Sequence, residues 1–134
     1  MFRREIIGAA AAAALLLSTG FAQAADAAKA DSNYDPKYPF PVPGKVTVVD
    51  FGASWCASCP EMEKLMIEMQ KEYGDRAAFV TIDIDKWLGI EDIFLIDEMP
   101  AQIFYDPKGE PIWKHTGPVD ADTMRERVNI LLEG

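Results

Sequence analysis

Two cysteines separated by two residues, Cys56 and Cys59, lie between a run typical of a buried strand and a run typical of a helix. The strand run covers residues 46–51, and the helix run extends from Glu61 to about Tyr73. The first N–H groups of a helix are unpaired and the helix dipole favours negative charge, so a thiolate at Cys56 would have a lowered pKa. Cys59 follows on the same helical face, within reach of the first sulfur. The spacing predicts a dithiol that opens and closes.

Three interpretations of this pair compete. A structural disulfide here would close a very short ring and would constrain the unfolded chain by only about 2 kcal/mol. A structural zinc site needs four Cys or His ligands, whereas this chain has two cysteines and one distant histidine, His115. Redox exchange is the favoured interpretation, and no metal site is expected.

The first 24 residues have the features of a secretory signal peptide. Arg3 and Arg4 give a positive start, residues 6–17 are apolar, and residues 22–24 form a small-x-small cleavage site. We therefore expect cleavage after about Ala24 and export to the periplasm. The alternative, a retained membrane anchor, is less favoured because the apolar run is shorter than the roughly 20 residues that a spanning helix needs.

Export changes how the two cysteines are interpreted. Thiols outside the cytoplasm tend to be oxidised, so a partner has to keep an isolated pair in its working redox state. Either a membrane thiol electron donor or an oxidant is therefore implied, and the donor is the favoured partner.

The charge of the chain limits the classes of partner. Removing residues 1–24, which carry Arg3, Arg4 and Glu5, changes the net charge from −9 to −10. Binding to nucleic acid or anionic lipid needs clustered Lys and Arg, so neither partner is expected.

Residues 25–44 contain four prolines and little periodicity, which predicts an extended lead-in held against the domain by Tyr38 and Phe40. One globular domain is expected to follow at residues 45–134, because a chain of this length supports a single core.

Within that domain, runs typical of strands and helices alternate. The expected strands are residues 45–51, 77–84, 101–105 and 111–116, and the expected helices are residues 57–73, 86–97 and 120–132. The order β-α-β-α-β-β-α predicts an α/β fold with a central mixed four-stranded sheet flanked by helices.

Two of the expected helices have recognisable apolar faces. In residues 57–73 the spacing of Met62, Leu65, Met66 and Met69 predicts a core-facing stripe. In residues 86–97 the predicted inward side chains are Trp87, Ile90, Ile93 and Phe94, although Gly89 weakens this helix. Asp120 is the expected N-cap of the last helix.

Taken together, these features resemble the thioredoxin family over residues 45–134. Residues 48–59, Val-Val-Asp-Phe-Gly-Ala-Ser-Trp-Cys-Ala-Ser-Cys, are similar to that family's active-site signature. Pro100 stands where the family has its cis-proline, and Gly117 also corresponds. The resemblance implies a thioredoxin fold.

The resemblance also implies roles for individual residues. Cys56 would attack a substrate disulfide as a thiolate, and Cys59 would resolve the mixed disulfide. Asp50 would be a desolvated carboxylate with a raised pKa that takes the proton from Cys59.

Three further residues acquire roles through the same resemblance. Trp55 would shield the sulfurs, and Met99 with Pro100 would line a groove that binds substrate by strand-like pairing.

Some positions depart from the cytoplasmic thioredoxin pattern. Ala57-Ser58 replaces Gly-Pro, Thr81 stands where many thioredoxins have a lysine, and Glu98 and Ala101 flank the Met-Pro dipeptide. Residues 56–64 are more similar to the C-terminal thioredoxin domain of periplasmic disulfide-interchange reductases of the DsbD type. In that group an acidic residue also occupies the position of Glu63, which leaves two interpretations of Glu63 open. The resemblance implies that it helps Asp50 hold the thiol protons, whereas a glutamate on a helix is more often a solvated charge.

The expected function is a monomeric periplasmic thiol–disulfide oxidoreductase that reduces, or relays electrons to, disulfides of exported proteins. It needs no bound cofactor, because the Cys56–Cys59 dithiol is itself the redox centre. Two alternatives stay open: a disulfide oxidase or isomerase, and a non-catalytic thioredoxin-like binding module or metal chaperone.

Overall fold

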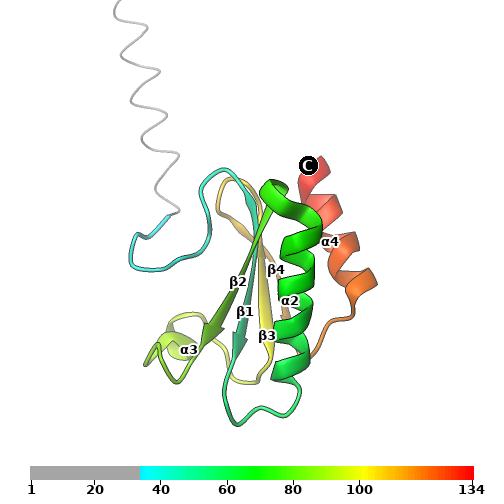
Figure 1. Cartoon of the computed structure of the whole chain (residues 1–134). Helices are drawn as coiled ribbons and strands as arrows, with labels where there is room; N and C mark the ends of the chain where they lie inside the picture. Colours follow the sequence, from blue (N-terminus) through cyan, green and yellow to red (C-terminus); the bar gives the residue numbers. More distant parts are fainter. Residues whose placement is uncertain (1–33) are drawn as a thin grey trace, which may run out of the picture. The chain divides into compact units, whose positions relative to one another are not determined.

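The computed structural model describes residues 34–134 (Figure 1), so the expected signal peptide and the first part of the lead-in lie outside the described residues. The elements follow one another as β1 (Val46–Gly52), α2 (Cys59–Tyr73), η2 (Gly74–Arg76), β2 (Ala77–Asp83), α3 (Ile90–Ile93), β3 (Ala101–Tyr105), β4 (Pro111–Thr116) and α4 (Ala121–Glu133). The predicted order of strands and helices is confirmed. Among these residues, no helix is long and apolar enough to cross a membrane.

The four strands form one mixed sheet in the order β2-β1-β3-β4. β1 pairs in parallel with β2 and antiparallel with β3, and β3 pairs antiparallel with β4. Every residue of β1 is buried, as the apolar run at residues 46–51 predicted. The predicted α/β class with a mixed four-stranded sheet is therefore confirmed. Because β1 lies inside the sheet, its carboxyl end positions the loop that carries Cys56 and leads into α2 at Cys59.

Helices α2 and α4 lie on the same side of the sheet (Figure 1). Met62, Met66 and Met69 of α2 are each at most 2% exposed, and Leu65 packs at the edge of the same cluster. The predicted apolar stripe is confirmed. Asp120 caps α4 by accepting a hydrogen bond from the Thr123 N–H at 2.7 Å, also as predicted.

The lead-in residues 34–44 pack on the domain through aromatic side chains. Phe40 is 1% exposed and its ring centroid lies 5.7 Å from that of Phe51 and 5.1 Å from that of Phe94. The Tyr34 hydroxyl donates a hydrogen bond to the carbonyl oxygen of Pro107, in the turn between β3 and β4, at 2.6 Å. The first described residue is thereby attached to that turn.

The helix predicted over residues 86–97 is wrong in length, because α3 comprises only Ile90–Ile93. Gly89 has φ 82° and Leu95 has φ 57°, and such left-handed backbone conformations do not occur inside a right-handed helix. Ile93, predicted to face inward, is 57% exposed. Ile96, which was not predicted, is buried instead.

The helix expected from residue 57 begins two residues later, at Cys59. Pro60 lies in its first turn, where proline is favoured because the missing N–H would have no partner in any case. The second cysteine is therefore the first residue of α2, and the first cysteine lies in the loop before it.

Candidate active site

Cys56 and Cys59 form a disulfide at the junction of β1 and α2, with their Cα atoms 5.4 Å apart. Both residues are 8% exposed. The Cys56 N–H donates to the Ala53 carbonyl oxygen at 3.1 Å, which holds the loop in a tight turn. Ser58, the N-cap residue, makes no capping hydrogen bond with its side chain. The first N–H groups of α2 are thus available to stabilise a thiolate at Cys56 once the disulfide opens.

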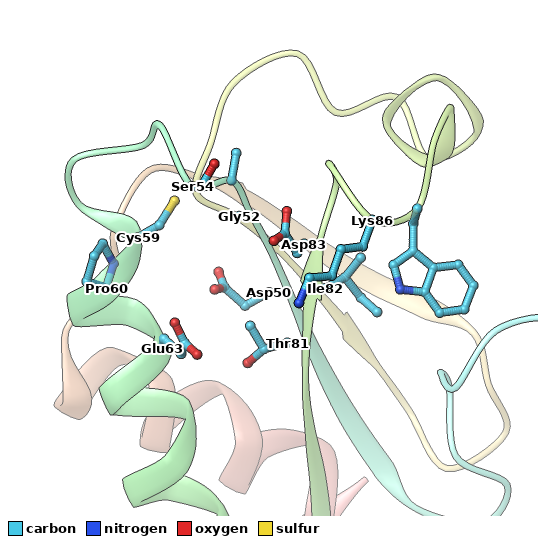
Figure 2. Close-up of a pocket in the computed structure, with 12 residues that line it drawn as sticks. Asp50, Gly52, Ser54, Cys59, Pro60, Glu63, Thr81, Ile82, Asp83 and Lys86 are labelled. Atoms are coloured by element: carbon cyan, nitrogen blue, oxygen red, sulfur yellow. The ribbon is translucent and has the colours of Figure 1, made fainter.

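Asp50 lies in β1 behind this disulfide and is 1% exposed. Figure 2 shows its carboxyl group facing Cys59 and Glu63 of α2 across a pocket. Burial raises the pKa of Asp50 from 3.8 to about 7, the hydrogen bond from Gln102 lowers that pKa, and the charge of Glu63 raises it. Asp50 can therefore both hold and release a proton near neutral pH.

The pocket beside the disulfide brings together residues from three parts of the chain. Its lining is formed by Asp50, Gly52, Ala53, Ser54, Cys59, Pro60, Glu63, Thr81, Ile82, Asp83, Lys86 and Trp87. The expected neighbours Asp50, Cys59 and Glu63 are among them. Glu63 itself is exposed, so it faces both the pocket and the solvent.

Two side chains near Asp50 were not predicted from the sequence. Gln102 of β3 donates from Nε2 to Asp50 Oδ1 at 2.9 Å. Lys86, which follows β2, extends its side chain into the pocket with the amino group on the side of Asp50 (Figure 2). Gln102 could have been noticed as a polar residue within the buried run 101–105. No sequence pattern predicts that Lys86 reaches the pocket.

The residues expected to contact substrate differ in exposure, because Trp55 is exposed, Met99 is half-buried and Pro100 is buried. Trp55, adjacent to Cys56, is 67% exposed. The Met99–Pro100 peptide bond is cis, and Met99 packs against the apolar cluster that contains both cysteines. The Pro100 carbonyl oxygen accepts a hydrogen bond from the Gly117 N–H at 2.7 Å, which ties this loop to the end of β4.

The donor groups of this site do not form a metal cage. Among residues 34–134, no group of three or more His, Cys, Asp or Glu side chains is placed so that it could hold a metal ion. The chemistry available to the site is the exchange of thiols and disulfides together with proton transfer at Asp50.

Gly52 sets how closely the second cysteine approaches β1. A Cβ atom at this position would lie 3.3 Å from Cys59 Sγ and 3.4 Å from Cys59 Cβ. Replacing Gly52 by alanine is therefore expected to push Cys59 outward and to destabilise the oxidised protein by about 1–3 kcal/mol, the usual cost of overpacking. Urea denaturation of the oxidised protein measures this effect.

Ala53→Gly serves as the neighbouring control, since it changes the residue after Gly52 without adding an atom near the sulfur. A Gly52→Ala variant as stable as the wild type would show that Cys59 moves away from the added methyl group at no cost.

Comparison with known proteins places these features in context. The family model described as Thioredoxin matches residues 30–129, which is most of the chain. Over 133 residues the chain is 27% identical to the thiol:disulfide interchange protein TxlA of Synechococcus elongatus, covering 96% of this chain and 70% of that protein. It is 32% identical over 93 residues to the thioredoxin-like protein HCF164 of Arabidopsis thaliana, covering 68% of this chain and 36% of that protein.

Shorter relatives match over a similar part of the chain. Thioredoxin Y of rice chloroplasts is 29% identical over 89 residues, covering 66% of this chain and 52% of that protein. The chain thus spans about half of the length of several curated relatives, or less.

Solved structures agree with the sequence comparisons. Chloroplastic thioredoxin z matches with a TM-score of 0.62 and 26% identity, covering 68% of this chain and 81% of that chain. The germline-specific thioredoxin Deadhead of Drosophila matches with a TM-score of 0.58 and 26% identity, covering 66% of this chain and 82% of that chain.

Proposed function

Since the chain belongs to the thioredoxin family, we propose that it is a thiol–disulfide oxidoreductase that reduces, or relays electrons to, the disulfides of exported proteins. The observation that carries this proposal is the Cys56–Cys59 disulfide at the start of α2, with the buried carboxyl of Asp50 behind it. A buried structural disulfide would need no such proton carrier. The pair is therefore a redox centre, and no further cofactor takes part in the exchange.

The reaction begins from the reduced dithiol. The Cys56 thiolate attacks one sulfur of the substrate disulfide, so that a Cys56–substrate bond forms, the substrate S–S bond breaks and the released sulfur leaves as a thiolate. The helix N-terminus supports this step because it lowers the pKa of the attacking thiol.

The second step releases the substrate. Asp50 takes the proton from Cys59, and the Cys59 thiolate attacks Cys56 Sγ, so the internal disulfide forms and the second substrate thiolate leaves. Two electrons pass from the dithiol to the substrate. The charge of Glu63 is one cause of the raised pKa of Asp50, so Glu63 helps that carboxyl to keep the proton once it has been taken from Cys59.

Substrate binding is assigned to the surface next to Cys56. Trp55 offers an exposed aromatic surface beside Cys56, and the backbone at Met99 and Pro100 pairs with an extended substrate segment. Strand-like pairing recognises backbone rather than side chains, so substrates of varied sequence are accepted.

The setting we propose is the periplasm, with residues 1–24 as a cleaved signal peptide, residues 25–44 as the lead-in and residues 45–134 as the catalytic domain. A monomer of this kind is recharged by a membrane thiol donor. Relatives named as thiol:disulfide interchange proteins support exchange between thiols and disulfides as the reaction.

The reduction potential of the Cys56–Cys59 couple tests the proposal. We expect a value near the roughly −270 mV of thioredoxin, because the proposed function requires the dithiol to give electrons to substrate disulfides. Equilibration of the protein with thiol buffers of known potential, followed by Trp fluorescence, measures it. A value near the roughly −120 mV of strong oxidants would instead make the protein a disulfide donor.

A further inference from the structure

A row of polar side chains crosses the sheet on the face covered by α2. The strand register pairs Asp50 of β1 with Thr81 of β2 and with Gln102 of β3, and it pairs Gln102 with His115 of β4. Directly paired residues in neighbouring strands project to the same face. The row lies at the end of a face that is otherwise apolar, so each of its members needs a physical explanation.

Of these residues, Gln102 is the one whose presence is least explained by the stability of the fold. It is 0% exposed, its Nε2 donates to Asp50 Oδ1 at 2.9 Å, and its Oε1 is buried without a hydrogen-bond partner among the described atoms. A buried amide with an unpaired oxygen lowers stability, whereas a methionine or leucine of similar size would add apolar contacts. The position therefore favours an apolar side chain unless the amide has a task.

The surroundings of Asp50 indicate that task. Cys59 and Glu63 face it from α2, Thr81 from β2, and Lys86 from the segment after β2. Of the described side chains, only that of Gln102 makes a hydrogen bond to the carboxylate that the structure records. Burial and the charge of Glu63 both favour the protonated carboxyl, and a donated hydrogen bond favours the ionised one.

We propose that Gln102 is a positioning residue for the exchange reaction, and that its Nε2–H stabilises the ionised form of Asp50 so that this carboxyl can accept the proton of Cys59 at neutral pH. This inference rests on the proposed function, because it assigns Asp50 the part of proton acceptor. Gln102 touches neither sulfur nor substrate and acts only through Asp50.

Replacing Gln102 by methionine tests the inference in the oxidised protein, where neither cysteine titrates. Loss of the donated bond is expected to raise the pKa of Asp50 by about one pH unit, as measured by the carboxyl carbon-13 shift of Asp50 between pH 4 and 10. Gln102→Leu provides a second apolar variant in case the first does not fold. His115→Gln is the matched control: it alters the other neighbour of Gln102 and is expected to leave the Asp50 titration unchanged.

The rate of mixed-disulfide resolution provides the second readout. A rise of one unit from about 7 would reduce the ionised fraction of Asp50 about fivefold at pH 7, so resolution should slow about fivefold there and converge with the wild type above about pH 9. In an Asp50→Asn background, Gln102→Met should cause no further change in the pH profile. A purely structural role for Gln102 would lower the rate at every pH.

An unmoved Asp50 titration overturns the inference, and so does a moved titration with an unmoved rate profile. Neither result bears on whether the wild-type protein reduces disulfides, which is the separate test of the proposed function.

Discussion

Replacing Cys56 by serine is expected to abolish disulfide reduction, with a loss of about a thousandfold or more. A serine hydroxyl cannot replace the thiolate, because it is a far weaker nucleophile at neutral pH and cannot enter a disulfide. Reduction of a model protein disulfide, followed by the appearance of substrate thiols, measures the effect.

Replacing Cys59 by serine is expected to have a different outcome, namely the accumulation of a mixed disulfide between Cys56 and substrate. The attacking thiolate remains, but no second thiol is present to resolve the product. Non-reducing electrophoresis and intact mass detect the adduct, and the Cys56→Ser/Cys59→Ser double variant is the control that should form none. Near-normal turnover by either single variant would contradict the mechanism.

The largest effect on stability is expected from Asp50→Asn above neutral pH. Asp50 has a pKa of about 7 in the folded protein and a reference value of 3.8, so between these values the unfolded chain releases a proton that the folded protein keeps. The free energy of unfolding of the wild type therefore falls as the pH rises through this range. The loss is complete above pH 7 and amounts to about 4 kcal/mol. Asparagine has similar shape and no charge, so the variant should be more stable than the wild type at pH 8.

Urea denaturation of the oxidised proteins between pH 4 and 9 measures this difference. The difference between wild type and variant, rather than either curve alone, isolates Asp50 from the other carboxyl groups. Asp75→Asn is the matched control, since Asp75 is an exposed carboxyl on η2. Parallel stability curves for the wild type and Asp50→Asn would show that Asp50 is not held protonated by burial.

The parts of the fold that depend on local pattern were predictable from the sequence. The buried run at 46–51 became β1, and the methionine spacing of residues 57–73 gave the inward face of α2. Residues 86–97 carry a similar apolar spacing but form only one short turn of helix, because Gly89 and Leu95 take left-handed conformations. Periodicity alone does not reveal where the backbone leaves the helical region.

In the candidate site, too, residues close together in the sequence could be predicted, whereas residues brought together by strand pairing could not. Cys56, Cys59 and Asp50 lie close together in the sequence and could be assigned from one signature. Gln102 lies 52 residues from Asp50, and its contact depends on the antiparallel register of β1 and β3. Lys86 reaches the pocket from a segment whose path was predicted wrongly. Side chains that act across strands need the register before they can be recognised.

The attachment of Tyr34 to the turn at Pro107 determines how the domain would be oriented when it is immobilised through its N-terminal side. That turn follows the end of β3 that pairs with the beginning of β1, whereas the disulfide follows the end of β1, so the two lie at opposite ends of the sheet (Figure 1). A bead, an electrode or a fusion protein joined on the N-terminal side of Tyr34 would therefore leave the reactive sulfurs facing outward. The domain can be immobilised from that side without blocking access of bulky substrates.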